Sequence, residues 1–148
     1  MQTETNTAEV AAPRTVPPRP EPASERQLRD APKCTILIID DDAGIRDALA
    51  EILELSGYQV AVAADGQEGV ELLEVGLEPS AIVLDLMMPR MDGWTFLDRL
   101  RHDPKHQGVP VVVTSAVASE SPPGADLCLQ KPFDVGQLDR AVARLCAH

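Results

Sequence analysis

The chain has 148 residues and a formal net charge of −11. This length suits one domain of ordinary size, and the acidity argues against direct binding to nucleic acid or to an anionic membrane. No stretch approaches the roughly 20 apolar residues of a membrane span, and the N-terminus lacks the apolar core of a signal peptide, so we expect no membrane insertion and a cytoplasmic location.

The first 32 residues differ in composition from the rest of the chain. They hold six of the thirteen prolines and no aromatic residue, with four arginines against five acids. Such a segment cannot bury enough apolar surface to offset the entropy of ordering, and its near-neutral charge is not typical of a nucleic-acid tail. We therefore predict a disordered arm at 1–32 and one folded domain at 33–148.

From residue 33 onward, apolar runs alternate with helical patterns. Strand-like runs occupy 35–40, 58–63, 80–85, 109–115 and 126–130. Amphipathic spacing between or after them predicts helices from Ile45 to Leu53, Asp65 to Leu73, Asp92 to Leu100 and Asp134 to Leu145. Strands that alternate with helices imply right-handed crossovers. The predicted fold is α/β, a doubly wound, five-stranded parallel sheet of the flavodoxin-like order 2-1-3-4-5.

Carboxylates end two of these predicted strands. Asp40, Asp41 and Asp42 follow the run Ile36–Ile39, and Asp85 ends the run that begins at Ala81. If the strands are parallel neighbours, Asp40, Asp41 and Asp85 converge, and two like charges about 4 Å apart cost on the order of 4 kcal/mol at an effective dielectric near 20. A hard divalent ion such as Mg²⁺ would offset that cost, and Lys131 could supply a second positive charge.

The other metal-ligating residue types show no such convergence. Cys34, Cys128 and Cys146 are odd in number and lack paired spacing, so we expect reduced thiols that pack as small hydrophobes. The three histidines match no ligand pattern, and we expect none of them to be catalytic.

Four motifs in register with the strand ends carry a family resemblance. In chain order they are Ile36–Asp42, Ile82–Gly93, Val111–Ala116 and Lys131–Phe133. Together they resemble the receiver domain of two-component response regulators, over about residues 35 to 147, in the stand-alone, chemotaxis-regulator-like form. Each motif is weak alone, whereas four in this order are specific.

The resemblance implies a role for each site residue. Asp85 matches the phosphoacceptor, which takes a phosphoryl group from a histidine kinase or a histidine phosphotransfer protein. Asp40 and Asp41 match the acids that bind Mg²⁺ together with Asp85, and the backbone carbonyl of Met87 would add a ligand. Lys131 would bind one phosphoryl oxygen, through a cis Lys131–Pro132 bond, and the Ser115 hydroxyl another.

Each role has a simpler alternative. The acids after the first strand could solvate a loop or cap a helix, and capping is what we expect of Asp42. Ser115 could be an ordinary strand-end hydroxyl, with the neighbouring Thr114 competing for its role. Lys131 could be a surface lysine.

Two departures from the family pattern concern the output. Cys128 stands where receivers usually carry Tyr or Phe, three residues before the lysine. Only fifteen residues, including Pro122-Pro123-Gly124, separate Ser115 from Lys131, so we expect a shortened or missing fourth helix. The chain also ends after the last predicted helix, so we expect a stand-alone domain without an output domain.

The leading hypothesis is a phosphoacceptor switch that signals to an unknown downstream protein by protein contacts. It is not an enzyme beyond its own phosphoryl transfer and autodephosphorylation. One alternative is a receiver-like scaffold whose output does not depend on phosphate. A less favoured one is an aspartate-dependent phosphohydrolase, in which Asp40 would be the nucleophile.

Overall fold

The computed structural model describes residues 34–116 and 121–146, and the predicted arm at 1–32 lies outside them. The five strands are β1 (Thr35–Ile39), β2 (Gln59–Ala63), β3 (Ala81–Asp85), β4 (Val111–Ser115) and β5 (Leu127–Gln130). All adjacent pairs are parallel, in the order β2-β1-β3-β4-β5. The predicted topology is therefore confirmed, with strand ends displaced by one or two residues.

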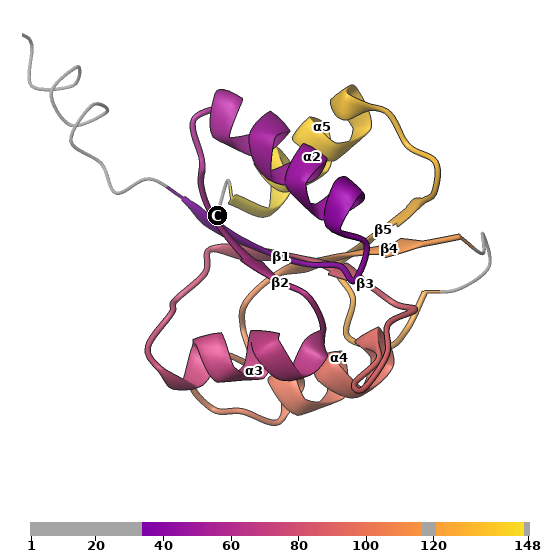
Figure 1. The fold of residues 1–148 in the computed structure, drawn as a ribbon. Helices are drawn as coiled ribbons and strands as arrows, with labels where there is room; N and C mark the ends of the chain where they lie inside the picture. Colours follow the sequence, from indigo (N-terminus) through magenta and orange to yellow (C-terminus); the bar gives the residue numbers. More distant parts are fainter. Residues whose placement is uncertain (1–33, 117–120, 147–148) are drawn as a thin grey trace, which may run out of the picture. The chain divides into compact units, whose positions relative to one another are not determined.

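Four helices cover the two faces of the sheet. They are α2 (Ala43–Leu55), α3 (Gly66–Glu74), α4 (Gly93–Arg101) and α5 (Val135–Cys146). Helices α2 and α5 lie on one face, and α3 and α4 lie on the other (Figure 1). None of these helices is long and apolar enough to cross a membrane.

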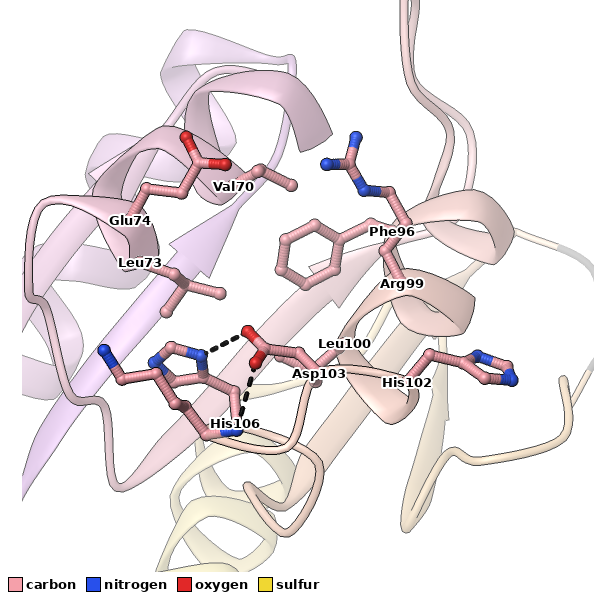
Figure 2. A pocket seen from close by; sticks show the side chains of 10 residues that line it. Val70, Leu73, Glu74, Phe96, Arg99, Leu100, His102, Asp103 and His106 are labelled. Carbon is pink, nitrogen blue, oxygen red and sulfur yellow. Dashed lines mark hydrogen bonds and ion pairs between the residues drawn. The ribbon is translucent and has the colours of Figure 1, made fainter.

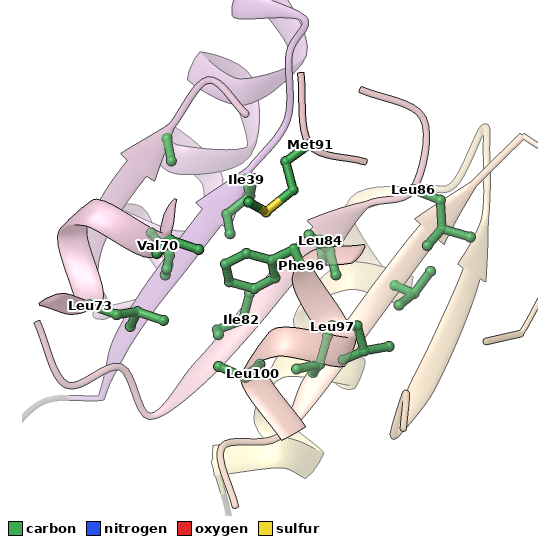
Figure 3. Close-up of a cluster of buried hydrophobic side chains, with 14 residues drawn as sticks. Ile39, Val70, Leu73, Ile82, Leu84, Leu86, Met91, Phe96, Leu97 and Leu100 are labelled. Carbon is green, nitrogen blue, oxygen red and sulfur yellow. The ribbon is translucent and has the colours of Figure 1, made fainter. Parts of the chain in front are cut away.

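Side-chain alternation along the strands creates two separate cores. Leu37 and Ile39 of β1 face α3 and α4, in the cluster that also contains Phe96 (Figure 3). Ile36 and Ile38 face α2 and α5 in the second cluster. Because the central strands are buried on both faces, they appear in the sequence as continuous apolar runs rather than alternating ones.

Helix starts follow the signals in the sequence. The carboxylates of Asp42, Asp65 and Asp92 accept hydrogen bonds from backbone N–H groups three residues later, at 3.1, 2.8 and 2.8 Å. These are N-caps, so the capping role expected of Asp42 is confirmed. At the other end of α2, Gly57 has a φ of 99°, a left-handed conformation that favours glycine.

The connection from β4 to β5 departs from the regular alternation. Residues 116 and 121–126, the described part of this connection, contain no helix, as the two adjacent prolines predicted. On β5, the side chains of Cys128 and Gln130 are exposed while Leu127 and Leu129 pack against the α2/α5 cluster. The described residues therefore leave one face of this edge strand uncovered.

Candidate functional site

Three carboxylates meet at the carboxyl end of the central strands. Asp40 directly follows β1 and Asp85 ends β3, and the two strands pair in register up to Ile39 and Leu84. Asp40 and Asp85 are only 2% and 5% exposed, whereas Asp41 is exposed. One oxygen from each of Asp40, Asp41 and Asp85 lies within 4.8 Å of the others. The convergence predicted from the strand ends is therefore present in the structure.

Lys131 reaches this cluster from the end of β5. Its Nζ donates to Asp85 Oδ1 at 3.3 Å and to Asp40 Oδ2 at 3.4 Å. The Lys131–Pro132 peptide bond is cis, as the family resemblance implied. Lys131 N also donates to the Ser115 carbonyl at 2.7 Å, which joins the ends of β4 and β5. Lys131 is thus paired with both buried carboxylates.

The electrostatics of the cluster leave negative charge in excess. Burial, and then the neighbouring Asp40 carboxylate, raise the pKa of Asp85 to about 6, although Lys131 acts against them. Burial alone would lower the pKa of Lys131, but Asp40 and Asp85 outweigh it and raise that pKa. One lysine thus does not neutralise the carboxylates. The donor set is all oxygen and partly exposed, which fits a hard divalent cation such as Mg²⁺ held by Asp40, Asp41 and Asp85.

Hydrogen bonds from neighbouring residues fix the two buried aspartates. Asp42 N donates to Asp40 Oδ1 at 2.9 Å, and the Arg46 guanidinium donates to the Asp40 carbonyl at 2.9 Å. Met87 N donates to Asp85 Oδ1 at 3.4 Å, so that oxygen accepts from both Met87 and Lys131. Asp85 Oδ2 accepts no hydrogen bond from the described residues. It is the oxygen left available for chemistry.

The start of α4 lies directly against the acceptor strand. A Cβ at Gly93 would lie 2.6 Å from the Asp85 carbonyl oxygen and 2.7 Å from Leu86 Cα, so a side chain there would displace the site. Gly93 N donates to the Leu86 carbonyl at 2.9 Å. The glycine in the motif around Asp85 thus allows close packing of helix and strand.

Two predicted residues lie at the site without a decided role. Ser115 ends β4 and is 1% exposed, and Met87 has a side chain that is 63% exposed. Thr114 is also 1% exposed, and its hydroxyl has no hydrogen-bond partner among the described residues. The choice between Ser115 and Thr114, and the carbonyl role of Met87, remain predictions.

Sequence reasoning missed two charged partners near the site. One is Arg46, whose guanidinium binds the Asp40 carbonyl. The other is Arg90, which has a φ of 64° and forms an ion pair with the α3 cap Asp65. Burial would raise the pKa of Asp65, but the Glu68 N–H and Arg90 hold it below its usual range. Neither arginine has a spacing that would have distinguished it from a surface residue.

A cavity of about 520 Å³ lies between α3 and α4, and none of the site carboxylates lines it (Figure 2). Its buried His106 contacts the Asp103 carboxylate through Nδ1 at 2.7 Å. Asp103 also accepts from Lys105 N at 3.0 Å, so the pair holds the turn after α4. His106 thus contributes to the structure of this loop.

Comparison with known proteins identifies the family. The model of the response regulator receiver domain matches residues 36–143. The chain belongs to the response regulator receiver family. It is 43% identical over 109 residues to the DNA-binding dual master transcriptional regulator RpaA of Synechocystis, a match over 70% of this chain and 45% of that protein. The receiver spans about half the length of several curated relatives that it matches.

Solved receiver structures share the fold. The chemotaxis response regulator CheY4 of Vibrio cholerae superposes with a TM-score of 0.71 at 27% identity, over 77% of this chain and 99% of that one. The receiver domain of the Pseudomonas aeruginosa histidine kinase PA1611 superposes with a TM-score of 0.73 at 25% identity, over 79% of this chain and 100% of that one. That structure has a magnesium ion in its active site cleft. This chain is thus a two-component signalling domain.

Proposed function

We propose that this receiver domain accepts a phosphoryl group on Asp85, with Mg²⁺, from a histidine kinase or a histidine phosphotransfer protein. One observation carries the proposal: Asp85 is buried beside Asp40 and Lys131, yet its Oδ2 accepts no hydrogen bond from the described residues. A cytoplasmic location, as expected from the family, belongs to the same proposal. So does an output through protein contacts rather than direct binding to nucleic acid.

The proposed step is an in-line displacement. Asp85 Oδ2 attacks the phosphorus of the donor's phosphohistidine, an O–P bond forms, the N–P bond breaks, and the electron pair stays on the imidazole. Lys131 would move from the free carboxylate to a phosphoryl oxygen, and Ser115 would donate to another. Mg²⁺ held by Asp40, Asp41, Asp85 and the Met87 carbonyl would neutralise charge on the transferring group. The domain would thus modify only its own Asp85 and would lose the phosphoryl group by autodephosphorylation. It would not be an enzyme for other substrates.

An apolar groove beside Lys131 supports a protein donor. It has a volume of about 470 Å³ and is lined by Ile45, Ala48 and Leu49 of α2 and by Lys131, Pro132 and Phe133. Ile45 is 37% exposed, so α2 offers apolar surface at the entrance to the site. A donor that docks on α2 would bring its phosphohistidine to Asp85.

The decisive experiment maps the phosphoryl adduct. The full chain is treated with acetyl phosphate and Mg²⁺, and the acyl phosphate is located by reduction with borohydride and peptide mapping. We expect the label on Asp85, its loss on chelation of Mg²⁺, and its loss in Asp85→Asn. Asp42→Asn is the matched control, because Asp42 caps α2 outside the cluster and Asn also caps helices. Undiminished labelling in Asp85→Asn would overturn the assignment.

The same map distinguishes the phosphohydrolase alternative. Both carboxylate oxygens of Asp40 already accept hydrogen bonds, Oδ1 from Asp42 N and Oδ2 from Lys131. Asp40 is therefore the poorer nucleophile of the two buried carboxylates. An adduct on Asp40 with turnover of acetyl phosphate would favour a hydrolase.

The scaffold alternative is supported by one observation, the absence of a helix from the described part of the β4–β5 connection. Partner binding with and without a beryllofluoride adduct at Asp85 separates it from a switch. A phosphate-dependent switch predicts at least a fivefold change in affinity, since coupling free energies are typically about 1–3 kcal/mol. Equal affinity in both states would favour the scaffold.

A further inference from the structure

Two cysteines lie together at the end of the sheet opposite the carboxylates. Cys34 directly precedes β1, and Cys146 is the last residue of α5. In Figure 1 the beginning of β1 and the end of α5 lie at the same end of the sheet. Both cysteines are half-buried against the α2/α5 core cluster. Residues 112 positions apart in sequence (146 − 34) are thus brought into one cluster by the fold.

The two cysteines line the same cavity and are close enough to influence each other's ionisation. Burial, and then a hydrogen bond to Cys34, raise the pKa of the Cys146 thiol to about 12. The Cys146 thiol therefore keeps its proton at neutral pH and is a poor first nucleophile. Tyr58 packs against the same core cluster, and burial, followed by Cys146 and Cys34, raises the pKa of its hydroxyl.

Small molecules can reach this pair. Cys34 and Cys146 both line an open cavity of about 470 Å³ whose other walls are Ser80, Gly108, Pro110, Asp126 and Leu145. A peptide-sized disulfide reagent fits a cavity of this volume. The third cysteine, Cys128, is exposed on β5 and is not among the residues that line it.

We propose that Cys34 and Cys146 form a reversible dithiol–disulfide pair that responds to low-molecular-weight disulfides such as oxidised glutathione. The Cys34 thiolate attacks one reagent sulfur, a mixed disulfide forms and one thiolate leaves. Cys146 then loses its proton and attacks Cys34 sulfur, which expels the second thiolate. The protein loses two electrons and two protons, and the reagent takes them up as two thiols. The product would fasten the end of α5 to the start of β1.

The test uses the full chain in glutathione buffers of increasing oxidised fraction, followed by alkylation, intact mass and peptide mapping. We expect a loss of two hydrogens, with the Cys34 and Cys146 peptides linked and Cys128 alkylated. Cys128→Ala is the matched control and should form the same link. Cys34→Ala should form none, and Cys146→Ala should stop at a glutathione adduct on Cys34.

A second measurement covers variants that fold poorly. The linked wild-type chain should melt about 5–15 °C above its reduced form, because a crosslink over a long loop restricts the unfolded chain. Cys128→Ala should show the same increase, and Cys34→Ala none. The proposal fails if the only disulfides formed include Cys128, if the wild-type chain stops at glutathione adducts, or if the linked form melts at or below the reduced one.

Discussion

Lys131 and Arg101 each form a cluster with carboxylates. The two clusters differ in how completely the charges and hydrogen-bonding groups are matched by partners. Lys131 faces two buried carboxylates through contacts of 3.3 and 3.4 Å, and the pKa of Asp85 rises to about 6, chiefly through burial. Arg101 instead meets the Gln107, Val109 and Gly124 carbonyls and the Asp126 carboxylate at 2.6–3.0 Å. The first cluster keeps an excess of negative charge, and the second has none.

The Arg101 cluster holds several segments of the domain together. Its guanidinium holds the β4–β5 connection at Gly124 and Asp126 against the end of α4. Asp126 Oδ2 also accepts from Val111 N at 2.8 Å, so the start of β4 is included. Arg101 thus stabilises the β4–β5 connection, whose described residues contain no helix. A saturated cluster indicates a structural role, whereas an unsaturated one indicates a site for a ligand.

The largest effect is expected from breaking the saturated cluster. Arg101→Met should lower the free energy of unfolding by about 4 kcal/mol, because several charge-assisted hydrogen bonds are lost together. Urea unfolding measures it. Arg99→Met is the control, since Arg99 is exposed two residues earlier on the same helix, and it should change stability by less than about 0.5 kcal/mol. Equal losses in both variants would contradict the structural role.

Removing a charge from the unsaturated cluster should raise the free energy of unfolding, the opposite of the effect of Arg101→Met. The folded-state pKa of Asp85 is raised to about 6, well above the ordinary value of an aspartate, so the native state binds this proton more tightly than the unfolded chain. Its contribution to stability is therefore lost as pH rises from about 4 to 6. Metal-free Asp85→Asn should be more stable than wild type by about 3 kcal/mol at pH 8, and by little at pH 4.

Asp103→Asn should change stability in the direction opposite to Asp85→Asn. Hydrogen bonds from His106 and Lys105 hold the pKa of Asp103 below its usual range, so its contribution to stability appears above the unfolded pKa. This variant should lose stability at pH 8, where Asp85→Asn gains it. If both variants shifted stability in the same direction, the charge at Asp85 would not be the cause.

The comparison also shows what the sequence could and could not predict. Asp40 and Asp85 end apolar runs, and parallel neighbours bring such ends together, so local pattern and topology sufficed. Arg101 was missed because most of its partners are backbone carbonyls, which leave no signature in the sequence. Arg46 was missed for the same reason. Only the family resemblance predicted the cis bond before Pro132. The residues themselves could not, because any X-Pro bond can be cis or trans.

A smaller effect is expected when a cation supplies the missing charge. Mg²⁺ should stabilise the wild-type fold by about 1.4 kcal/mol at ten times its dissociation constant, by mass action on the native state. The increase in Tm should be lost or strongly reduced in Asp85→Asn and in Asp41→Asn. Thermal unfolding in a magnesium series measures it, with Asp42→Asn as the neighbouring control. An equal increase in all variants would mean that the cation binds elsewhere.

The smallest effect concerns Thr114 Oγ1. Among the described residues it is the one buried side-chain nitrogen or oxygen atom without a hydrogen-bond partner. Thr114 pairs with Asp85 across β3 and β4, and alternation places it on the face of Val112, toward α2 and α5. Thr114→Val keeps the shape and removes an unpaired hydroxyl, so stability should rise by about 1 kcal/mol. Urea unfolding measures the change.

The same variant decides between the two hydroxyl residues of β4. If Ser115 binds the phosphoryl group, Thr114→Val should leave labelling by acetyl phosphate within twofold of wild type, whereas Ser115→Ala should slow it or alter the response to beryllofluoride. Ser115 alternates onto the face of Val113, so the two hydroxyls of this strand point to opposite sides of the sheet. Loss of labelling in Thr114→Val with a stable fold would assign the role to Thr114, and its unpaired hydroxyl would then belong to the unsaturated cluster.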